Sequence, residues 1–309
     1  MTEGLVLPPL VIVGPTASGK SSLAVALAKR IGGVEIVSAD AMAVYRGMTI
    51  GTAKPSEVER AGIPHHLIDV ADPWEEYTVA RFQGDVSKVV EGINERGAVP
   101  IIVGGTGLYV RAVVDNFAIP GQYPDVRAVI EQEESTERLW AHLGALDPVA
   151  AAKMTASNRR RVVRALEVTL GSGRPFSDYG PGVDQYPASS FCQVGLRLPR
   201  EELDRRIEAR FQAQMESGFL VEVEALSHRP LSRTASRALG YRELLDHLDG
   251  AMTGEEALAL AAQRTKRFAR RQERWFRRDP RITWFDALEV DLIAQVEQRW
   301  RKPSGGAPQ

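Results

Sequence analysis

Composition and charge describe an ordinary folded chain. Its 309 residues include 39 Lys and Arg against 40 Asp and Glu, a formal net charge of −1, and 44% of the residues are apolar. This balance excludes a mainly disordered chain and a globally basic nucleic-acid coat. At roughly 150 residues per domain, the length predicts about two domains. The single cysteine, Cys192, excludes an intrachain disulfide and favours a reducing compartment.

The two ends of the chain show no targeting pattern. Residues 1–9 contain no Lys or Arg, and the apolar run at 10–13 is too short for the core of a secretory signal. No stretch approaches the roughly 18 apolar residues that a membrane helix needs. Residues 302–309 are rich in Pro, Gly and Ser, which is typical of a flexible tail. We therefore expect a cytoplasmic protein without membrane contacts.

The first third of the chain alternates short apolar strands with amphipathic helices. The runs Leu10–Val13, Val34–Val37 and Pro100–Val103 are bounded by glycine, and residues 23–31 carry apolar side chains at helical spacing. This order predicts an α/β fold, a parallel sheet flanked by helices. Because ligands bind at the carboxyl ends of such strands, we expect the site in the loops that follow these three runs.

The pattern changes at about residue 116. Proline and glycine interrupt the chain at 120–124, and helices are then predicted at 125–143, from Asp147-Pro148 onward and at 158–170. No strand pattern lies among them. We interpret residues 116–188 as a helical insertion domain.

The core resumes after the insertion. We assign residues 1–115 and 189–301 to one catalytic core. A strand is predicted at 191–198, and helices are predicted at 201–226, 253–278 and 288–300.

A glycine-rich loop, residues 14–21, matches GxxxxGK[ST] at every fixed position between a strand and a helix. Its backbone N–H groups and the helix amino terminus are suited to a diphosphate or a nucleotide such as ATP, Lys20 can neutralise an oxyanion, and the Ser21 hydroxyl can ligate Mg²⁺. The expected diphosphate-binding residues are Gly14, Pro15, Thr16, Ala17, Ser18, Gly19, Lys20 and Ser21.

The acidic partner of this loop is ambiguous. A nucleoside triphosphatase would hold its metal with an acid at the end of a second strand. Asp40 follows the run at 34–37, and Asp69 follows Leu67-Ile68, whereas the run at 100–103 ends in glycine. Asp40 is placed to act on a substrate held by the loop, but the cap of a turn is an equally open role for it.

Six segments, taken in order, resemble the bacterial tRNA dimethylallyltransferases, also called tRNA isopentenyltransferases. The matches run in order from near residue 10 to near residue 285, so the resemblance covers most of the chain. The segments are Gly14–Ser21, Ser38–Met48, Ile50–Pro55, Gly104–Tyr109, Arg164–Val168 and Arg267–Phe276.

The resemblance implies transfer of a dimethylallyl group from its diphosphate to the exocyclic amine of the adenine just 3′ of the anticodon, with Mg²⁺. The glycine-rich loop then holds the prenyl diphosphate instead of a nucleotide. An aromatic amine is a poor nucleophile, so a general base is expected, and Asp40 fits. Lys20, Thr16 and the loop amides fit the departing diphosphate. By resemblance, Arg210 is a further diphosphate contact.

The resemblance also implies contacts with the tRNA anticodon stem-loop. The family commonly has Ser and Gln where this chain has Ala41 and Ala43, and Gln where it has Arg160, so polar contacts are lost at two positions and charge is added at the third. The expected tRNA-binding residues are Asp40, Ala41, Met42, Ala43, Thr106, Arg127, Arg160, Arg161, Arg164, Arg270, Arg271 and Arg274.

Charge near the carboxyl end favours an RNA partner. Residues 264–281 carry nine Lys or Arg against two acidic residues, 9 − 2 = +7 in a chain whose total is −1. The aromatic residues Phe268, Trp275 and Phe276 among them either face the core or stack on bases. The alternatives are a P-loop small-molecule kinase, an adenine-nucleotide prenyltransferase and a nucleotide-regulated RNA-binding protein. We expect a monomer.

Overall fold

The structure is a computed structural model that describes residues 7–180, 182–183 and 185–302. The chain divides into two units, one formed by the segments up to residue 114 and from residue 188 onward, the other by residues 115–187. The tail predicted at 302–309 lies outside the described residues, apart from Lys302. Within the described part of the chain, no helix is long and apolar enough to cross a membrane.

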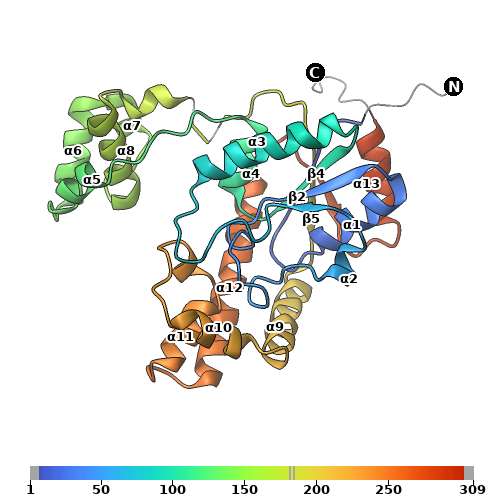
Figure 1. Cartoon of the computed structure of the whole chain (residues 1–309). Coiled ribbons are helices and arrows are strands. Elements are labelled where there is room, and N and C mark those ends of the chain that lie inside the picture. The colour runs from blue at the N-terminus through green and yellow to red at the C-terminus, as the bar shows by residue number, and fades with distance from the viewer. Residues whose placement is uncertain (1–6, 181, 184, 303–309) are drawn as a thin grey trace. The chain divides into compact units, whose positions relative to one another are not determined.

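The larger unit contains a parallel sheet of six strands in the order β3-β2-β4-β1-β5-β6 (Figure 1). This confirms the predicted α/β class, a parallel sheet flanked by helices. Two strands were not predicted, β3 and β6, and both lie at the edges of the sheet. The strands are β1 (Leu10–Val13), β2 (Val34–Ser38), β3 (His65–His66), β4 (Val99–Gly104), β5 (Cys192–Arg197) and β6 (Thr283–Asp286).

Alternation along the strands builds two apolar cores. Leu10 and Ile12 of β1 pack with α1 (Lys20–Ile31) and α13 (Leu292–Arg301) on one face. Val11 and Val13 face the opposite core, which includes residues of α3 (Val79–Glu95), α4 (Gly107–Val114), α9 (Arg200–Glu216) and α12 (Gly254–Phe276). Both faces of the sheet are therefore covered, as apolar parallel strands require (Figure 1).

The helices after β5 differ in one respect from the prediction. The single helix expected at 201–226 is two helices, α9 and α10 (Phe219–Ser227), because Gly218 takes a left-handed φ of 93° between them. The long α12 begins at a capping box in which Thr253 and Glu256 satisfy each other's backbone N–H groups. The remaining helices of this unit are α2 (Glu57–Arg60) and α11 (Tyr241–Leu248), with a 3₁₀ turn at Ala235–Arg237.

Among its described residues, the smaller unit contains helices and no strand. Ile130, Leu139, Leu143, Val162 and Leu166 are buried in a core of its own. The helix predicted at 125–143 is in fact two, because Ser135 caps a new helix by accepting the N–H of Arg138. The helices are α5 (Pro124–Glu131), α6 (Thr136–Leu146), α7 (Pro148–Ala152) and α8 (Arg159–Ser172), followed by a 3₁₀ turn at Phe176–Tyr179.

Candidate active site

The glycine-rich loop connects the buried strand β1 to α1 through backbone that glycine makes possible. Gly14 has a φ of 147°, and a Cβ there would lie 2.7 Å from the carbonyl oxygen of Leu196. Gly19 adopts a left-handed φ of 89°, and α1 begins at the next residue, Lys20. The free N–H groups of the first helical turn therefore face the loop, which is the arrangement that binds anions.

The side chain of Lys20 folds back over the glycine-rich loop to which it belongs. Its Nζ donates a hydrogen bond to the carbonyl oxygen of Pro15 at 2.6 Å. Burial lowers the pKa of Lys20 to about 8, and the nearby carboxylate of Asp40 opposes that shift in part. A buried ammonium without a carboxylate bonded to it is suited to an anionic ligand.

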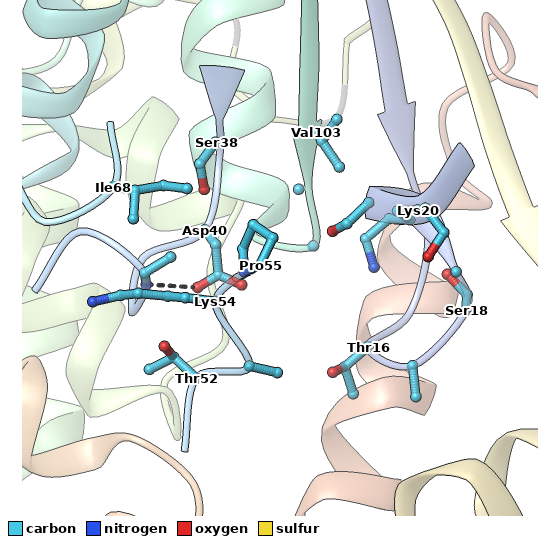
Figure 2. A pocket seen from close by; sticks show the side chains of 18 of the residues that line it. Thr16, Ser18, Lys20, Ser38, Asp40, Thr52, Lys54, Pro55, Ile68 and Val103 are labelled. Atoms are coloured by element: carbon cyan, nitrogen blue, oxygen red, sulfur yellow. Dashed lines mark hydrogen bonds between the residues drawn. The ribbon is translucent and has the colours of Figure 1, made fainter. Parts of the chain in front are cut away.

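A pocket of about 220 Å³ lies where the three loops singled out in the sequence meet. Figure 2 shows Asp40 and Ser38 on one side of it and Thr16, Ser18 and Lys20 on the other. The loop after β4 and the segment of residues 52–55 complete the walls. The pocket thus joins the carboxyl ends of β1, β2 and β4, the edge at which parallel sheets bind ligands.

Asp40 caps a turn and also lines the pocket. Its Oδ1 accepts the backbone N–H of Met42 at 2.8 Å and of Ala43 at 3.3 Å, so the carboxylate caps the turn that follows β2. The same side chain lines the pocket (Figure 2), and the described residues make no hydrogen bond to its Oδ2. Thr106, after β4, accepts the N–H of the adjoining Ala41 at 3.2 Å. The turn is held in place while one carboxylate oxygen stays available.

Arg210 brings a second cation from α9 to the pocket. Burial lowers the pKa of its guanidinium, and the charge of Asp40 opposes that shift. Its buried Nε lacks a hydrogen-bond partner, and no carboxylate within the described ranges forms an ion pair with it. Arg206, one turn earlier, instead binds Glu202 at 2.6 Å. An unpaired, partly buried guanidinium is costly unless a ligand anion neutralises it.

The segment at residues 49–55 was not assigned a role from the sequence, although it lies in a motif that carries the resemblance. Glu222 of α10 accepts the backbone N–H groups of Thr49, Ile50 and Gly51 at 2.9, 2.8 and 3.1 Å. Its carboxylate also accepts the hydroxyl of Tyr241 at 2.5 Å. A single glutamate therefore fixes the loop that forms one wall of the pocket.

Lys54, in the same segment, binds Asp69, one of the two acids considered as partners of the glycine-rich loop. Its Nζ bonds Asp69 Oδ1 at 2.5 Å and the carbonyl oxygen of Tyr45. Asp69 does not line the pocket, whereas Asp40 does. Of the two acids weighed in the sequence, Asp40 is the one placed at the site.

The family models and the curated relatives that match this chain name the same kind of enzyme. The IPP transferase family model matches residues 43–279, and an isopentenyl transferase model matches residues 9–70. A tRNA dimethylallyltransferase of Kineococcus radiotolerans is 51% identical, over 94% of this chain and 95% of that protein. The chain belongs to the IPP transferase family. The resemblance inferred from the motifs is thereby confirmed.

Solved structures of the IPP transferase family share the fold. The tRNA isopentenylpyrophosphate transferase from Bacillus halodurans is 36% identical with a TM-score of 0.69, and the match covers 96% of this chain and 98% of that one. A eukaryotic dimethylallyltransferase acting on tRNA is 27% identical with a TM-score of 0.78, over 94% of this chain and 77% of that one.

The basic side chains of α12 divide into two groups, those paired with a carboxylate and those without an ion pair. Arg264 pairs with Glu243, Lys266 with Glu208, and Arg270 with Asp204 at 3.2 Å. Three of the seven surplus charges are therefore neutralised by acids from α9 and α11, which a count along the sequence does not include. The exposed arginines for which the described residues offer no ion pair are Arg267, Arg271 and Arg274. Phe276 is buried, and Phe268 and Trp275 are partly buried.

The arginines of the insertion also fall into two groups, those paired with a carboxylate and those exposed to solvent. Arg127 and Arg164 both bind the buried carboxylate of Glu167, at 3.3 and 2.7 Å, and Arg164 donates to the carbonyl oxygen of Pro120 as well. Arg160 and Arg161 are exposed. Arg127 and Arg164 thus hold the insertion together, while Arg160 and Arg161 present their charge to solvent.

The protein ligands available for a divalent cation are few. Ser21 lines the pocket beside Lys20. No group of three His, Cys, Asp or Glu side chains that could hold a metal occurs in the described residues. This donor set fits Mg²⁺, which keeps several waters and is commonly held by one or two protein oxygens together with substrate phosphates.

Proposed function

We propose that the protein transfers the dimethylallyl group of dimethylallyl diphosphate to the exocyclic amine of the adenine 3′ of the anticodon, position 37, in tRNA, and releases diphosphate. One observation carries this proposal. A single pocket joins an anion-binding loop, two cations without a bonded carboxylate, Lys20 and Arg210, and the carboxylate of Asp40. The names of the relatives, tRNA dimethylallyltransferase among them, support tRNA as the acceptor.

The chemistry follows from where each group lies. The carbon–nitrogen bond forms at the allylic carbon as its bond to the diphosphate oxygen breaks, and the amine loses a proton. Asp40 accepts that proton as general base. Lys20, Arg210, Thr16 and the amides of the glycine-rich loop stabilise the negative charge that grows on the leaving diphosphate.

Mg²⁺ is the cofactor that these residues suit. The Ser21 hydroxyl would hold it next to the diphosphate. When bound, the cation neutralises part of the charge on the leaving group.

Exposed arginines are proposed as contacts for the anticodon stem-loop. Arg267, Arg271 and Arg274 of α12 and Arg160 and Arg161 of α8 are exposed and suited to phosphate contacts. Asp40 and Ala43 line the pocket, where the target base would enter flipped out of its stack, and Thr106 bonds the backbone of Ala41 beside them. We propose that the enzyme acts as a monomer in the cytoplasm, where Cys192, which is buried, stays reduced.

The experiment that tests this function supplies the purified protein with Mg²⁺, dimethylallyl diphosphate and unmodified tRNA. A mass gain of one dimethylallyl group on the nucleotide 3′ of the anticodon is expected. Matched reactions contain free adenosine monophosphate, or ATP with small acceptors. Prenylation of the nucleotide alone would replace tRNA with an adenine nucleotide as acceptor, and phosphoryl transfer from ATP would favour a kinase.

A further inference from the structure

Gln272 lies behind the pocket and joins two of its loops. It is buried on α12, and its Oε1 accepts the backbone N–H of Thr16 at 2.9 Å. Its Nε2 donates to the carbonyl oxygen of Gly105 at 2.8 Å. One amide therefore satisfies a donor of the glycine-rich loop and an acceptor of the loop after β4, 256 and 167 residues away in the sequence.

The contact continues to the proposed base. Thr106, the residue after Gly105, accepts the N–H of Ala41, which adjoins Asp40. A chain of three hydrogen bonds thus runs from the diphosphate loop through Gln272 and the loop after β4 to the turn that carries Asp40. Gln272 itself does not line the pocket, so its influence on the reacting groups is indirect.

The side-chain amide of Gln272 packs tightly against the backbone of Gly105. A Cβ added there would lie 2.2 Å from Gln272 Nε2, while the next contact outside that side chain, with the carbonyl oxygen of Gly14, would be an ordinary 3.4 Å. The backbone of Gly105 does not have the positive φ that favours glycine. The amide of Gln272 is therefore what excludes a side chain at position 105.

We infer that Gln272 is a positioning residue for prenyl transfer, which sets the distance between the diphosphate cradle and Asp40. This rests on the proposed function, because it assigns those two groups to leaving group and base. Misplacing reacting groups by about 1 Å can cost about 10²-fold in rate. Gln272 should therefore act on the chemical step more than on the binding of either substrate.

A double-mutant cycle tests this inference. Gln272→Ala removes both hydrogen bonds, and Gly105→Ala displaces the same amide from the other side. Each single change should lower the single-turnover rate of transfer about 10- to 100-fold and change the dissociation constant of dimethylallyl diphosphate less than about 3-fold. Because the collision disappears once position 272 is alanine, the double variant should be no slower than Gln272→Ala alone.

Controls separate positioning from folding. Gln263→Ala, an exposed glutamine on the same helix, should keep the wild-type rate. The melting temperature of each variant is measured alongside. If the fold-losses of rate in the two single variants multiply in the double variant, the inference is overturned. It is also overturned if the melting temperature falls while the rate stays unchanged. Absence of transfer by the wild type would overturn the proposed function instead, whereas the outcomes above, seen with an active wild type, would overturn the inference alone.

Discussion

Both the pocket and α12 carry cations, but these cations differ in whether a carboxylate is bonded to them. In the pocket, the only bond that Lys20 Nζ makes to the described residues is to a carbonyl oxygen, and Arg210 keeps a buried Nε without a partner. On α12, Arg264, Lys266 and Arg270 each bind a carboxylate from another helix. These three cations of the helix are already neutralised, whereas the two cations of the pocket have no carboxylate bonded to them.

The comparison shows that pairing, and not the count of charges, indicates which arginines serve a ligand. A buried cation without a carboxylate destabilises the empty protein, and that cost is recovered when an anion binds. A cation already bonded to a carboxylate must lose that bond before it meets a phosphate. On this criterion Arg210, Arg267, Arg271 and Arg274 are available, whereas Arg164 and Arg270 contribute to the fold.

The largest effect is expected at the carboxylate that faces the pocket cations. Asp40→Ala should lower the single-turnover rate by about 10² to 10⁴, the range for a positioned general base, while the dissociation constants of the diphosphate and tRNA change little. Rapid-quench transfer and equilibrium binding measure the two quantities. Since Oδ1 also caps a turn, Asp40→Asn serves as the matched variant, because its amide oxygen keeps the cap but cannot take the proton. A near-normal rate in Asp40→Asn would remove Asp40 from the role of base.

Arg210 and Arg206 sharpen the comparison on one helix. Arg210→Gln should lower transfer by about 10²-fold, as the loss of one donor to a developing anion does, and should weaken diphosphate binding. Arg206→Gln, one turn away and bonded to Glu202, should stay within about 2-fold of the wild type. Steady-state transfer rates and diphosphate titrations compare the pair. Equal losses in the two variants would mean that pairing does not distinguish ligand cations from structural ones.

Local patterns in the sequence predict the parts of the site that are local. The glycine-rich loop, the strands on either side of it and the position of Asp40 after β2 all follow from short motifs and apolar runs. β3 could not be found in this way, because it has two residues, His65 and His66, without an apolar pattern. The split at Gly218 was missed because a helical period continues across a residue whose left-handed φ ends α9.

Long-range contacts account for the rest. Gln272 is one polar residue in a basic helix, and its partners Thr16 and Gly105 have no periodic relation to it. Glu222 likewise fixes the segment at 49–51 from 171 to 173 residues away. Such roles depend on which elements the fold brings together, so the sequence of this one chain carries no local signal for them.

A smaller effect is expected on the exposed face of α12. Changing Arg267, Arg271 and Arg274 to Gln should lower tRNA affinity about tenfold near physiological salt. It should reduce the slope of log affinity against log salt by about 2, since each phosphate contact with single-stranded nucleic acid contributes about 0.7. A control triple of paired surface arginines, Arg81, Arg205 and Arg301, removes the same charge. Filter binding at several salt concentrations compares the two triples. An equal change of slope in both would show that total charge decides, and would contradict the distinction by pairing.

The smallest effect concerns the charge state of Lys20, whose pKa is lowered to about 8 by burial. As the pH rises through that value, the pocket loses a cation, so affinity for dimethylallyl diphosphate should fall about threefold between pH 7.5 and 8.5. This range lies above the second pKa of a phosphate group, about 6, so the ligand keeps its charge. Isothermal titration at each pH measures the affinity.

The loss of ligand affinity at high pH cannot result from unfolding caused by Lys20, because Lys20 affects folding stability in the opposite direction. In the unfolded chain the ammonium titrates near 10.5, so between about pH 8 and 10.5 the unfolded state binds more protons, and this group makes the folded state more stable as the pH rises. Above about pH 8, binding should therefore weaken while the Lys20 contribution to stability grows. Lys20→Arg, whose guanidinium keeps its proton throughout, should flatten the pH profile. A fall that persists in Lys20→Arg would assign the titration to another group.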